Sequence, residues 1–551
     1  MEEKNLEKRS EITMPHEEIS KEERVVQERE RKIFNSVKRN PAIIFYFLLI
    51  VLVILGVYIR MQPLLDHGGR PGLWDSTTND YTLGPDLDPF LFLRYAKEII
   101  ENGSLSRMDT LRNVPLGFDT SRELQMVSYM IFFTYRLLNI FGSYSINYAG
   151  AFMPVLFFAL TIIAFFLFVR EIFLRKHEKE SYVKSSIIAL IATFFMIVIP
   201  AFLSRTVAGI PEKESVAFFF MFLSFYLFLR AWKAESIRLS GLLAVLAGLS
   251  TALMGLTWGG VSYVYLTIGV SSLIAFILNK FNMKETIAYG LWFISSLIIF
   301  LTFTNRDTLK GVITSIDSGL AFVVLLILVL HLVIWKTKIK TLFKLEQIKL
   351  PKTITSIIIT VLLVLILGSV LFGFSFFGNK VSNLYNNLIK PTTGRWNTTV
   401  AENRQPYFSE WAGGFGVAIF WLFVTGSVVL FREMLDKLKK KEAWVLTGLY
   451  ILFFLGLVFS RYAPHPSLFD GENFISKLIY FGSALLLIAF FIYYYIKDHK
   501  ENLLNFEKML FEYLFLFVLF ILTLLTARGA VRLIMVLVPI APIFLSYLIV
   551  D

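Results

Sequence analysis

The segment PAIIFYFLLIVLVILGVYIRM, residues 41–61, indicates the fold class of this chain. It is almost entirely apolar and long enough to cross a hydrocarbon core about 30 Å thick. Similar apolar runs recur to the end of the sequence, and hydrophobic residues make up 56% of the 551 while charged residues make up 17%. A soluble chain of this length would need more charge to cover its surface. The sequence therefore predicts an all-α polytopic membrane protein with about 13–14 transmembrane helices, because a barrel would show short alternating strands.

The positions of lysine and arginine predict the topology of these spans. Basic residues cluster in the short loops near 170–179 and 336–352, which are therefore expected to be cytoplasmic. Residues 1–40 form a charged, mixed-sign tail and are also expected to be cytoplasmic. The alternation of spans then predicts external loops at 62–147, 204–214 and 378–410. An apolar stretch at 124–142 is expected to be a membrane-surface helical hairpin rather than a span.

Composition excludes several classes of function. The net charge of +12 reports topology, so no nucleic-acid partner is expected. The chain contains no cysteine, which excludes disulfides, zinc thiolate sites and thiol nucleophiles. The first apolar run is too long to be a cleavable signal peptide.

Each predicted external loop carries acidic residues that could bind a metal. Asp86 and Asp88 lie two residues apart in GPDLDPFLFLR (84–94), although Asp88 before a proline could simply start a helix. Glu212 and Glu214 lie in SRTVAGIPEKES (204–215), where acids at a helix N-terminus are equally ordinary. Glu402 lies in a long, asparagine-rich loop and could be merely exposed.

The three acidic loops together favour a divalent metal site on the external face. Mg²⁺ and Mn²⁺ prefer carboxylate and water ligands and are often shared with substrate phosphates. A transporter, the non-enzyme alternative, would instead carry its acidic residues within the spans.

Four motifs, in this order, resemble the catalytic subunit of N-linked oligosaccharyltransferase, of the archaeal AglB type. They are DPFLFLR (88–94), SRTVAGIPEKES (204–215), TVAENRQP (399–406) and ARGAVRLIMVLVPI (527–540). The resemblance implies a GT-C-type glycosyltransferase architecture, with residues 41–551 as the transmembrane catalytic region. It also implies transfer of an oligosaccharide from a lipid-phosphate carrier to asparagine of Asn-x-Ser/Thr. Another GT-C glycosyltransferase that uses a lipid-phosphate donor is the alternative enzyme.

The resemblance assigns roles to particular residues. Asp88 and Glu402 are implied to contact the acceptor amide, and the implied ligands of Mn²⁺ or Mg²⁺ are Asp88, Glu212, Glu214 and Glu402. Glu212 stands where the family usually has aspartate. The implied substrate-binding arginines are Arg532, Arg528 and Arg94. Asp86 lies outside the family's motif and is a weaker candidate.

The implied partners are a lipid-linked oligosaccharide, an acceptor polypeptide and membrane lipid, at a cell membrane with the active site outside. Asn102 and Asn397 are themselves in Asn-x-Ser/Thr tripeptides. The family's Trp-Trp-Asp-Tyr-Gly motif does not occur in this sequence. Its soluble acceptor-recognition domain is therefore expected to come from a longer chain or from a partner.

Overall fold

The computed structural model describes residues 42–66, 68–175, 178–348, 350–389 and 400–551. The chain divides into two units, residues 1–50 and 51–551, and the packing described below is that of the second unit. The predicted tail at 1–40 and the sequon at Asn397 lie outside the described residues.

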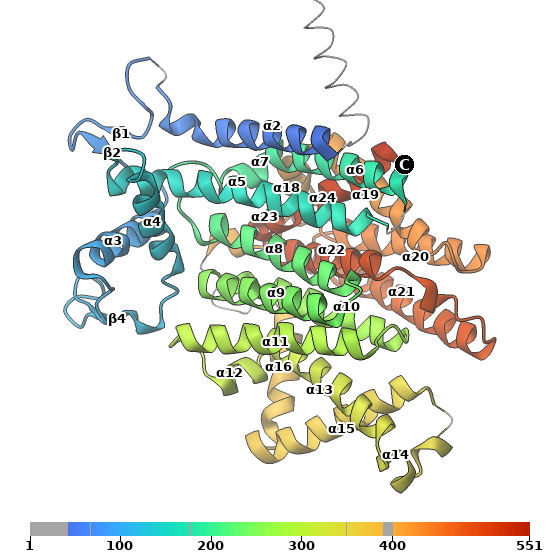
Figure 1. The fold of residues 1–551 in the computed structure, drawn as a ribbon. Helices are drawn as coiled ribbons and strands as arrows, with labels where there is room; N and C mark the ends of the chain where they lie inside the picture. Colours follow the sequence, from blue (N-terminus) through green and yellow to red (C-terminus); the bar gives the residue numbers. More distant parts are fainter. Residues whose placement is uncertain (1–41, 67, 176–177, 349, 390–399) are drawn as a thin grey trace, which may run out of the picture. The chain divides into compact units, whose positions relative to one another are not determined.

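The described residues contain fourteen helical segments that are long and apolar enough to cross a membrane, which confirms the predicted fold class and number of spans. Hydrogen bonds within each helix satisfy the backbone, as a hydrocarbon environment requires, and the apolar side chains suit contact with lipid. Figure 1 shows most of them lying side by side. The helices in these segments are α2 (Ala42–Met61), α5 (Ile146–Phe173), α6 (Lys179–Val198), α8 (Lys213–Lys233), α9 (Ile237–Thr257), α10 (Ser262–Ile277), α11 (Met283–Phe303), α13 (Asp317–Lys336), α15 (Lys352–Phe372), α19 (Val417–Met434), α20 (Lys440–Phe459), α21 (Phe474–Lys500), α22 (Phe511–Gly529) and α24 (Ala541–Val550). The last segment, Val531–Val550, consists of α24 and the two short elements before it.

Shorter elements fill the connections between these helices. Two small antiparallel ladders pair Trp74 with Tyr81 and Met108 with Asp119. The strands are β1 (Trp74–Asp75), β2 (Asp80–Tyr81), β3 (Met108–Asp109) and β4 (Phe118–Asp119). The short helices and 3-10 turns are η1 (Gln62–Leu64), α3 (Leu87–Asn102), η2 (Thr120–Arg122), α4 (Met126–Leu138), α7 (Pro200–Leu203), η3 (Gly259–Val261), α12 (Leu309–Thr314), α14 (Ile339–Leu342), η4 (Leu345–Gln347), α16 (Ser375–Ile389), η6 (Ala401–Asn403), α18 (Phe408–Phe415), η7 (Phe506–Lys508), η8 (Val531–Leu533) and α23 (Ile534–Leu537).

The stretch expected to be a surface hairpin forms one helix, α4, which is too short to be a span. It packs on α3 and α5 and leaves Phe133 and Leu137 exposed. The chain then turns directly into α5, because the Asn139 side chain binds both the backbone N–H and the C=O of Tyr144. The expected second arm of the hairpin is therefore absent.

A cluster of phenylalanine rings forms the core between α5, α8 and α22. Phe168 of α5 packs against Phe222 and Phe225 of α8, and Phe515 of α22 contacts both Phe168 and Phe225. Aromatic pairs of this kind add about 0.5–1.5 kcal/mol each beyond the area that they bury. The interlocked rings fix α8 firmly, and α8 carries two of the candidate site residues at its start.

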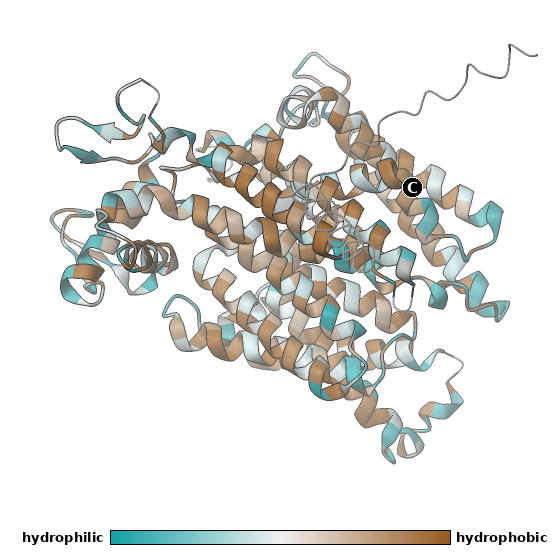
Figure 2. Cartoon of the chain, turned by 45° about the horizontal axis from the view of Figure 1, so that its top comes forward, coloured by the Kyte–Doolittle hydropathy of each residue, from teal (hydrophilic) through white to brown (hydrophobic). Residues whose placement is uncertain are grey.

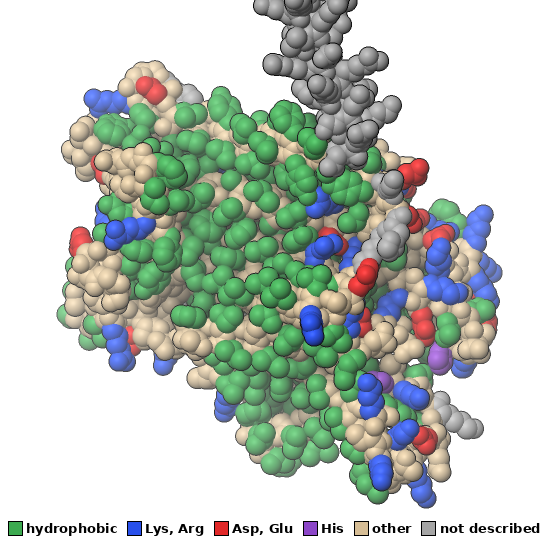
Figure 3. Space-filling view, viewed as in Figure 1, with side chains coloured by type: hydrophobic (Ala, Val, Ile, Leu, Met, Phe, Trp, Pro, Cys, Tyr) green, Lys and Arg blue, Asp and Glu red, His purple; other side chains and the backbone are tan. Residues whose placement is uncertain are grey.

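Neighbouring helices extend the core on both sides. Helix α9 packs between α8 and α11, α10 packs against α13 and α22, and α24 packs against α6 and α19. Hydrophilic residues gather in the loops at the helix ends (Figure 2). Figure 3 shows a broad apolar surface with charged side chains toward its ends, as expected for helices in contact with lipid.

Candidate active site

The loop between α6 and α8 is held by backbone hydrogen bonds from two other helices. Ala208 donates its N–H to the carbonyl of Arg60 at 2.9 Å, and Gly209 donates to the carbonyl of Ala151 at 2.8 Å. Gly209 has a φ of +87°, and a Cβ there would lie 2.6 Å from the Leu73 side chain. This position therefore requires glycine on two grounds, conformation and space.

The same glycine joins the first two acidic motifs. Gly84 donates its N–H to the carbonyl of Gly209 at 2.8 Å, although the two residues are far apart in sequence. This single bond brings the start of α3 beside the start of α8. In each motif one carboxylate precedes the helix and the other lies in its first turn; these residues are Asp86, Asp88, Glu212 and Glu214.

The third acidic residue, Glu402, lies on the 3-10 turn η6. Two hydrogen bonds fasten the residues that follow to the end of α22. Val531 donates its N–H to the carbonyl of Arg404 at 2.9 Å, and Arg528 Nη1 donates to Gln405 Oε1 at 3.1 Å. The loop that carries Glu402 is thus attached to the turn that carries Arg532.

These segments surround one cavity of about 530 Å³. Five of the residues singled out from the sequence line it together: Asp88, Glu212, Glu214, Glu402 and Arg532. Trp258, Gly259 and Tyr263, at the junction of α9 and α10, line it as well. A smaller cavity of about 260 Å³ lies alongside and shares Arg205, Glu402 and Arg532 with the larger one.

Arg205 connects the three acidic loops, and it was not assigned a role from the sequence. Its Nη1 lies 3.6 Å from Asp86 Oδ2 and 3.6 Å from Glu212 Oε1, while its Nη2 lies 3.1 Å from each carboxylate oxygen of Glu402. Burial lowers the pKa of Arg205, but the surrounding carboxylates, Glu214 and Glu402 first, raise it above its ordinary value. The sequence signal that could have found it is a lone arginine in an otherwise acidic loop.

Glu212 is the one buried carboxylate among the four that line the cavity. Burial, together with the neighbouring carboxylates of Glu214 and Asp88, raises the pKa of Glu212 to about 7. Arg205 opposes this shift without cancelling it. The donor set therefore suits a hard divalent cation. Among the described residues, however, no three acidic or histidine side chains are gathered closely enough to hold a metal ion as they stand.

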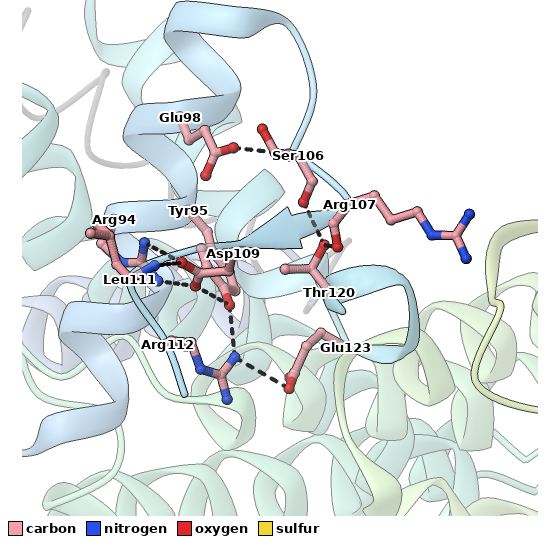
Figure 4. Close-up of polar contacts among 10 residues, drawn as sticks. All are labelled: Arg94, Tyr95, Glu98, Ser106, Arg107, Asp109, Leu111, Arg112, Thr120 and Glu123. Atoms are coloured by element: carbon pink, nitrogen blue, oxygen red, sulfur yellow. Dashed lines mark hydrogen bonds and ion pairs between the residues drawn. The ribbon is translucent and has the colours of Figure 1, made fainter. Parts of the chain in front are cut away.

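Two predicted substrate-binding arginines lie away from the cavity lining. Arg528 is buried; its Nε donates to the carbonyl of Leu457 at 3.2 Å, and it supports Gln405 as described above. Arg94 pairs with the buried carboxylate of Asp109 (Figure 4), which also accepts a hydrogen bond from the Tyr95 hydroxyl at 3.2 Å. The structure thus places Arg528 beneath the third acidic loop and Arg94 in the packing of α3 against β3.

Comparison with known proteins identifies the family. Residues 78–392, more than half of the chain, match the family described as oligosaccharyl transferase STT3, N-terminal. The chain belongs to this family. It is also similar to STT3, a subunit of the dolichyl-diphosphooligosaccharide–protein glycosyltransferase of Saccharomyces cerevisiae. The two are 25% identical over 372 residues, which cover 64% of this chain and 47% of the yeast protein.

Two solved structures of Archaeoglobus fulgidus oligosaccharyltransferase share the fold of this STT3 family member. The AglB enzyme, in complex with an inhibitory peptide and a dolichol-phosphate, matches with a TM-score of 0.61 at 16% identity, over 93% of this chain and 50% of that one. A complex with Zn and sulfate matches with a TM-score of 0.50 at 17% identity, over 91% and 52%. These matches confirm the GT-C architecture of a multi-pass membrane protein. The chain spans about half the length of these relatives.

Proposed function

We propose that this chain carries the catalytic membrane region of an oligosaccharyltransferase. It transfers an oligosaccharide from a lipid-phosphate carrier to the asparagine of Asn-x-Ser/Thr, on the external face of a cell membrane. One observation carries the proposal. Three acidic motifs and an arginine, far apart in the sequence, line one cavity in a chain of the STT3 family.

The two neighbouring cavities suit two substrates that meet at shared residues. The larger reaches Leu266 of α10 and Leu522 of α22, apolar side chains of spanning helices, and so suits the lipid-linked donor. The smaller is bordered by Ser204 and Glu410 and suits the acceptor peptide. Glu402 and Arg532 border both cavities and would face the reacting atoms from either side.

The chemistry requires activation of a poor nucleophile. The lone pair of an amide nitrogen is delocalised into its carbonyl group. Asp88 and Glu402 accept hydrogen bonds from the NH₂ group and reduce this delocalisation. The nitrogen then bonds to the anomeric carbon of the sugar, the bond from that carbon to the phosphate oxygen breaks, and the amide proton passes to a carboxylate or to solvent. Arg532 pairs with the departing lipid phosphate through its planar guanidinium.

A divalent cation, Mn²⁺ or Mg²⁺, is the cofactor proposed for the carboxylate cavity. Asp88, Glu212, Glu214 and Glu402 would hold it after small movements of their side chains, and it would offset charge on the leaving phosphate. The Zn complex of the A. fulgidus enzyme supports a divalent cation in general.

The test combines purified protein in detergent with a synthetic lipid-linked oligosaccharide and an Asn-x-Thr peptide. The acceptor-recognition domain, expected from a longer chain or a partner, is supplied with the protein. We expect glycopeptide by mass spectrometry, none from a peptide with glutamine in place of asparagine, and none after a chelator removes divalent metal. Mn²⁺ or Mg²⁺ added back should restore the product. Transfer to serine or threonine, or to a lipid, would instead identify another glycosyltransferase of this architecture.

A further inference from the structure

A third cavity, of about 240 Å³, lies directly beside the carboxylate cavity. The two cavities share Leu124, Gly259 and Arg306 in their linings. The third cavity is formed where α10, α12 and α13 meet, together with the loop 304–308 before α12. None of its residues has a role in the proposed reaction.

One hydrogen bond lies at the boundary between the two cavities. Ser262 lines the carboxylate cavity and donates its hydroxyl to Asp317, which lines the third cavity. Both residues lie at the starts of their helices, α10 and α13, which pack against each other. The two cavities therefore adjoin at Ser262 and Asp317.

The lining of the third cavity is mainly apolar, and it also includes hydroxyl, carboxylate and guanidinium groups. Ser318 donates its hydroxyl to the carbonyl of Val312 at 2.7 Å, and the Ser315 hydroxyl lies within donating distance of both Ser318 Oγ (2.6 Å) and the same carbonyl (3.1 Å). Arg306 and Asp307 are exposed, and among the described residues none forms an ion pair with either. The Arg306 guanidinium offers donors, and the Asp307 carboxylate and the serine oxygens offer acceptors, which a sugar ring with its many hydroxyl groups can use.

Backbone and ring surfaces complete the lining. Gly259 is open, because a Cβ there would meet no heavy atom within 4 Å, so a ligand can approach the backbone closely. Tyr265 and Phe300 add apolar surface for the face of a ring. A lipid chain would be a poor fit, since its methylene groups would desolvate Arg306 and Asp307 without replacing their hydrogen bonds to water.

We propose that this third cavity is a carbohydrate subsite that binds sugar of the lipid-linked donor close to the phosphate. The proposal rests on the proposed function and adds a glycan-recognition site to it. Arg306 and Asp307 hydrogen-bond sugar hydroxyl groups at the entrance, while the tail and phosphate remain in the carboxylate cavity. The site distinguishes the glycosylated carrier from the bare lipid phosphate.

The test compares two probes in a direct binding assay with the full chain: a lipid-linked oligosaccharide and the same lipid phosphate without sugar. For a variant with both Arg306→Gln and Asp307→Asn, we expect the Kd for the glycosylated lipid to rise about tenfold or more, as for lost hydrogen bonds to charged groups. The Kd for the bare lipid phosphate should not change. Lys310→Gln is the matched control, because Lys310 is exposed on α12 and lines neither cavity.

The alternatives give different results. An equal rise in Kd for both probes would mean that Arg306 binds the phosphate. No rise in Kd for either probe would mean that the cavity binds no part of the donor. Either outcome overturns the proposal. Because binding is measured without turnover, the subsite can fail while peptide transfer by the wild type succeeds. Conversely, absence of transfer would count against the proposed function, while the Kd values of the two lipid probes could still be compared.

Discussion

Arg205 holds the carboxylate of Glu402 with a single guanidinium nitrogen, Nη2, which lies 3.1 Å from both of its oxygens. The two residues come from loops almost two hundred positions apart in the chain. The other terminal nitrogen of Arg205 faces Asp86 and Glu212 at 3.6 Å. A charged fork of this shape orients carboxylates in a way that a point charge cannot. Arg205 therefore sets the position of Glu402 relative to the other two acidic loops.

We expect Arg205→Lys to lower kcat/KM for peptide transfer by about tenfold or more, although the charge is retained. Groups that orient metal-binding or reacting side chains commonly matter by this factor. The lysine ammonium cannot reach Glu402 and Glu212 together. Arg107→Lys is the control, since Arg107 makes only an exposed 3.7 Å pair with Asp119. Equal kinetics for the two variants would show that Glu402 does not depend on Arg205.

We expect Asp88→Asn and Glu402→Gln to reduce turnover far more than donor binding. Both carboxylates are proposed to act on the acceptor amide, whereas the lipid and glycan are held elsewhere. Loss of an interaction made mainly in the transition state lowers kcat and kcat/KM together. Single-turnover kinetics and direct donor binding, measured on the same preparations, check this. A parallel loss of donor affinity would contradict the assignment.

Arg60→Gln should destabilise the protein by about 2 kcal/mol, as expected when buried partners lose a charged donor. Arg60 is fully buried; its Nη1 donates to the carbonyl of Ile197 at 2.6 Å and its Nε donates to Thr206 Oγ1 at 3.2 Å. Glutamine is too short to reach both. The midpoint of thermal unfolding in detergent measures the effect, with the exposed Arg70→Gln as control. Equal midpoints for the two variants would show that Arg60 does not support the 204–212 loop.

Acid should loosen the segment that follows α3. The paired Arg94 guanidinium, aided by the Leu111 backbone N–H, lowers the pKa of Asp109 below its usual value (Figure 4). A lowered pKa stabilises the fold above the ordinary aspartate pKa of about 4, and this stability is lost as the pH falls below that value. Hydrogen exchange of residues 104–123 should therefore speed up as pH falls from about 5 to 3, after correction for intrinsic rates.

Two variants separate this effect from general acid damage. In Asp109→Asn the segment should already open more readily at neutral pH, and its opening should depend little on pH. Glu101→Gln, at an exposed position in α3, should behave like the wild type. If Asp109→Asn retains the acid response of the wild type, another group is responsible for it.

The sequence alone was enough for the fold class, and for much of the candidate site. Long apolar runs predict spans directly, because crossing a bilayer requires length and hydrophobicity rather than any particular partner. The acidic residues were recognisable from local pattern and Arg532 from the family resemblance, and they do share a cavity. Arg205 was missed because its importance depends on which loops meet, and that is decided by the bond between Gly84 and Gly209.

Other details depend on packing that local pattern does not encode. The family resemblance implied a substrate-binding role for Arg94, and local pattern gave no sign of its partner Asp109, which the turn into β3 brings back beside α3. Similarly, the helix at 126–138 ends at Asn139 because that side chain closes a turn with Tyr144. Such contacts join residues whose spacing carries no periodic signal.

In the proposed reaction, the attachment of the Glu402 loop to the end of α22 would link the binding of the two substrates. Val531 donates a hydrogen bond to the backbone carbonyl of Arg404, and Arg528 donates one to the side chain of Gln405. A shift of the turn that carries Arg532 would therefore move the Glu402 loop with it. Any change in acceptor affinity that donor phosphate produces through this connection must be matched by an equal change in donor affinity when acceptor binds. Saturating one substrate would then tighten or weaken the other by the same factor, so the order of addition would affect the path but not the final occupancy.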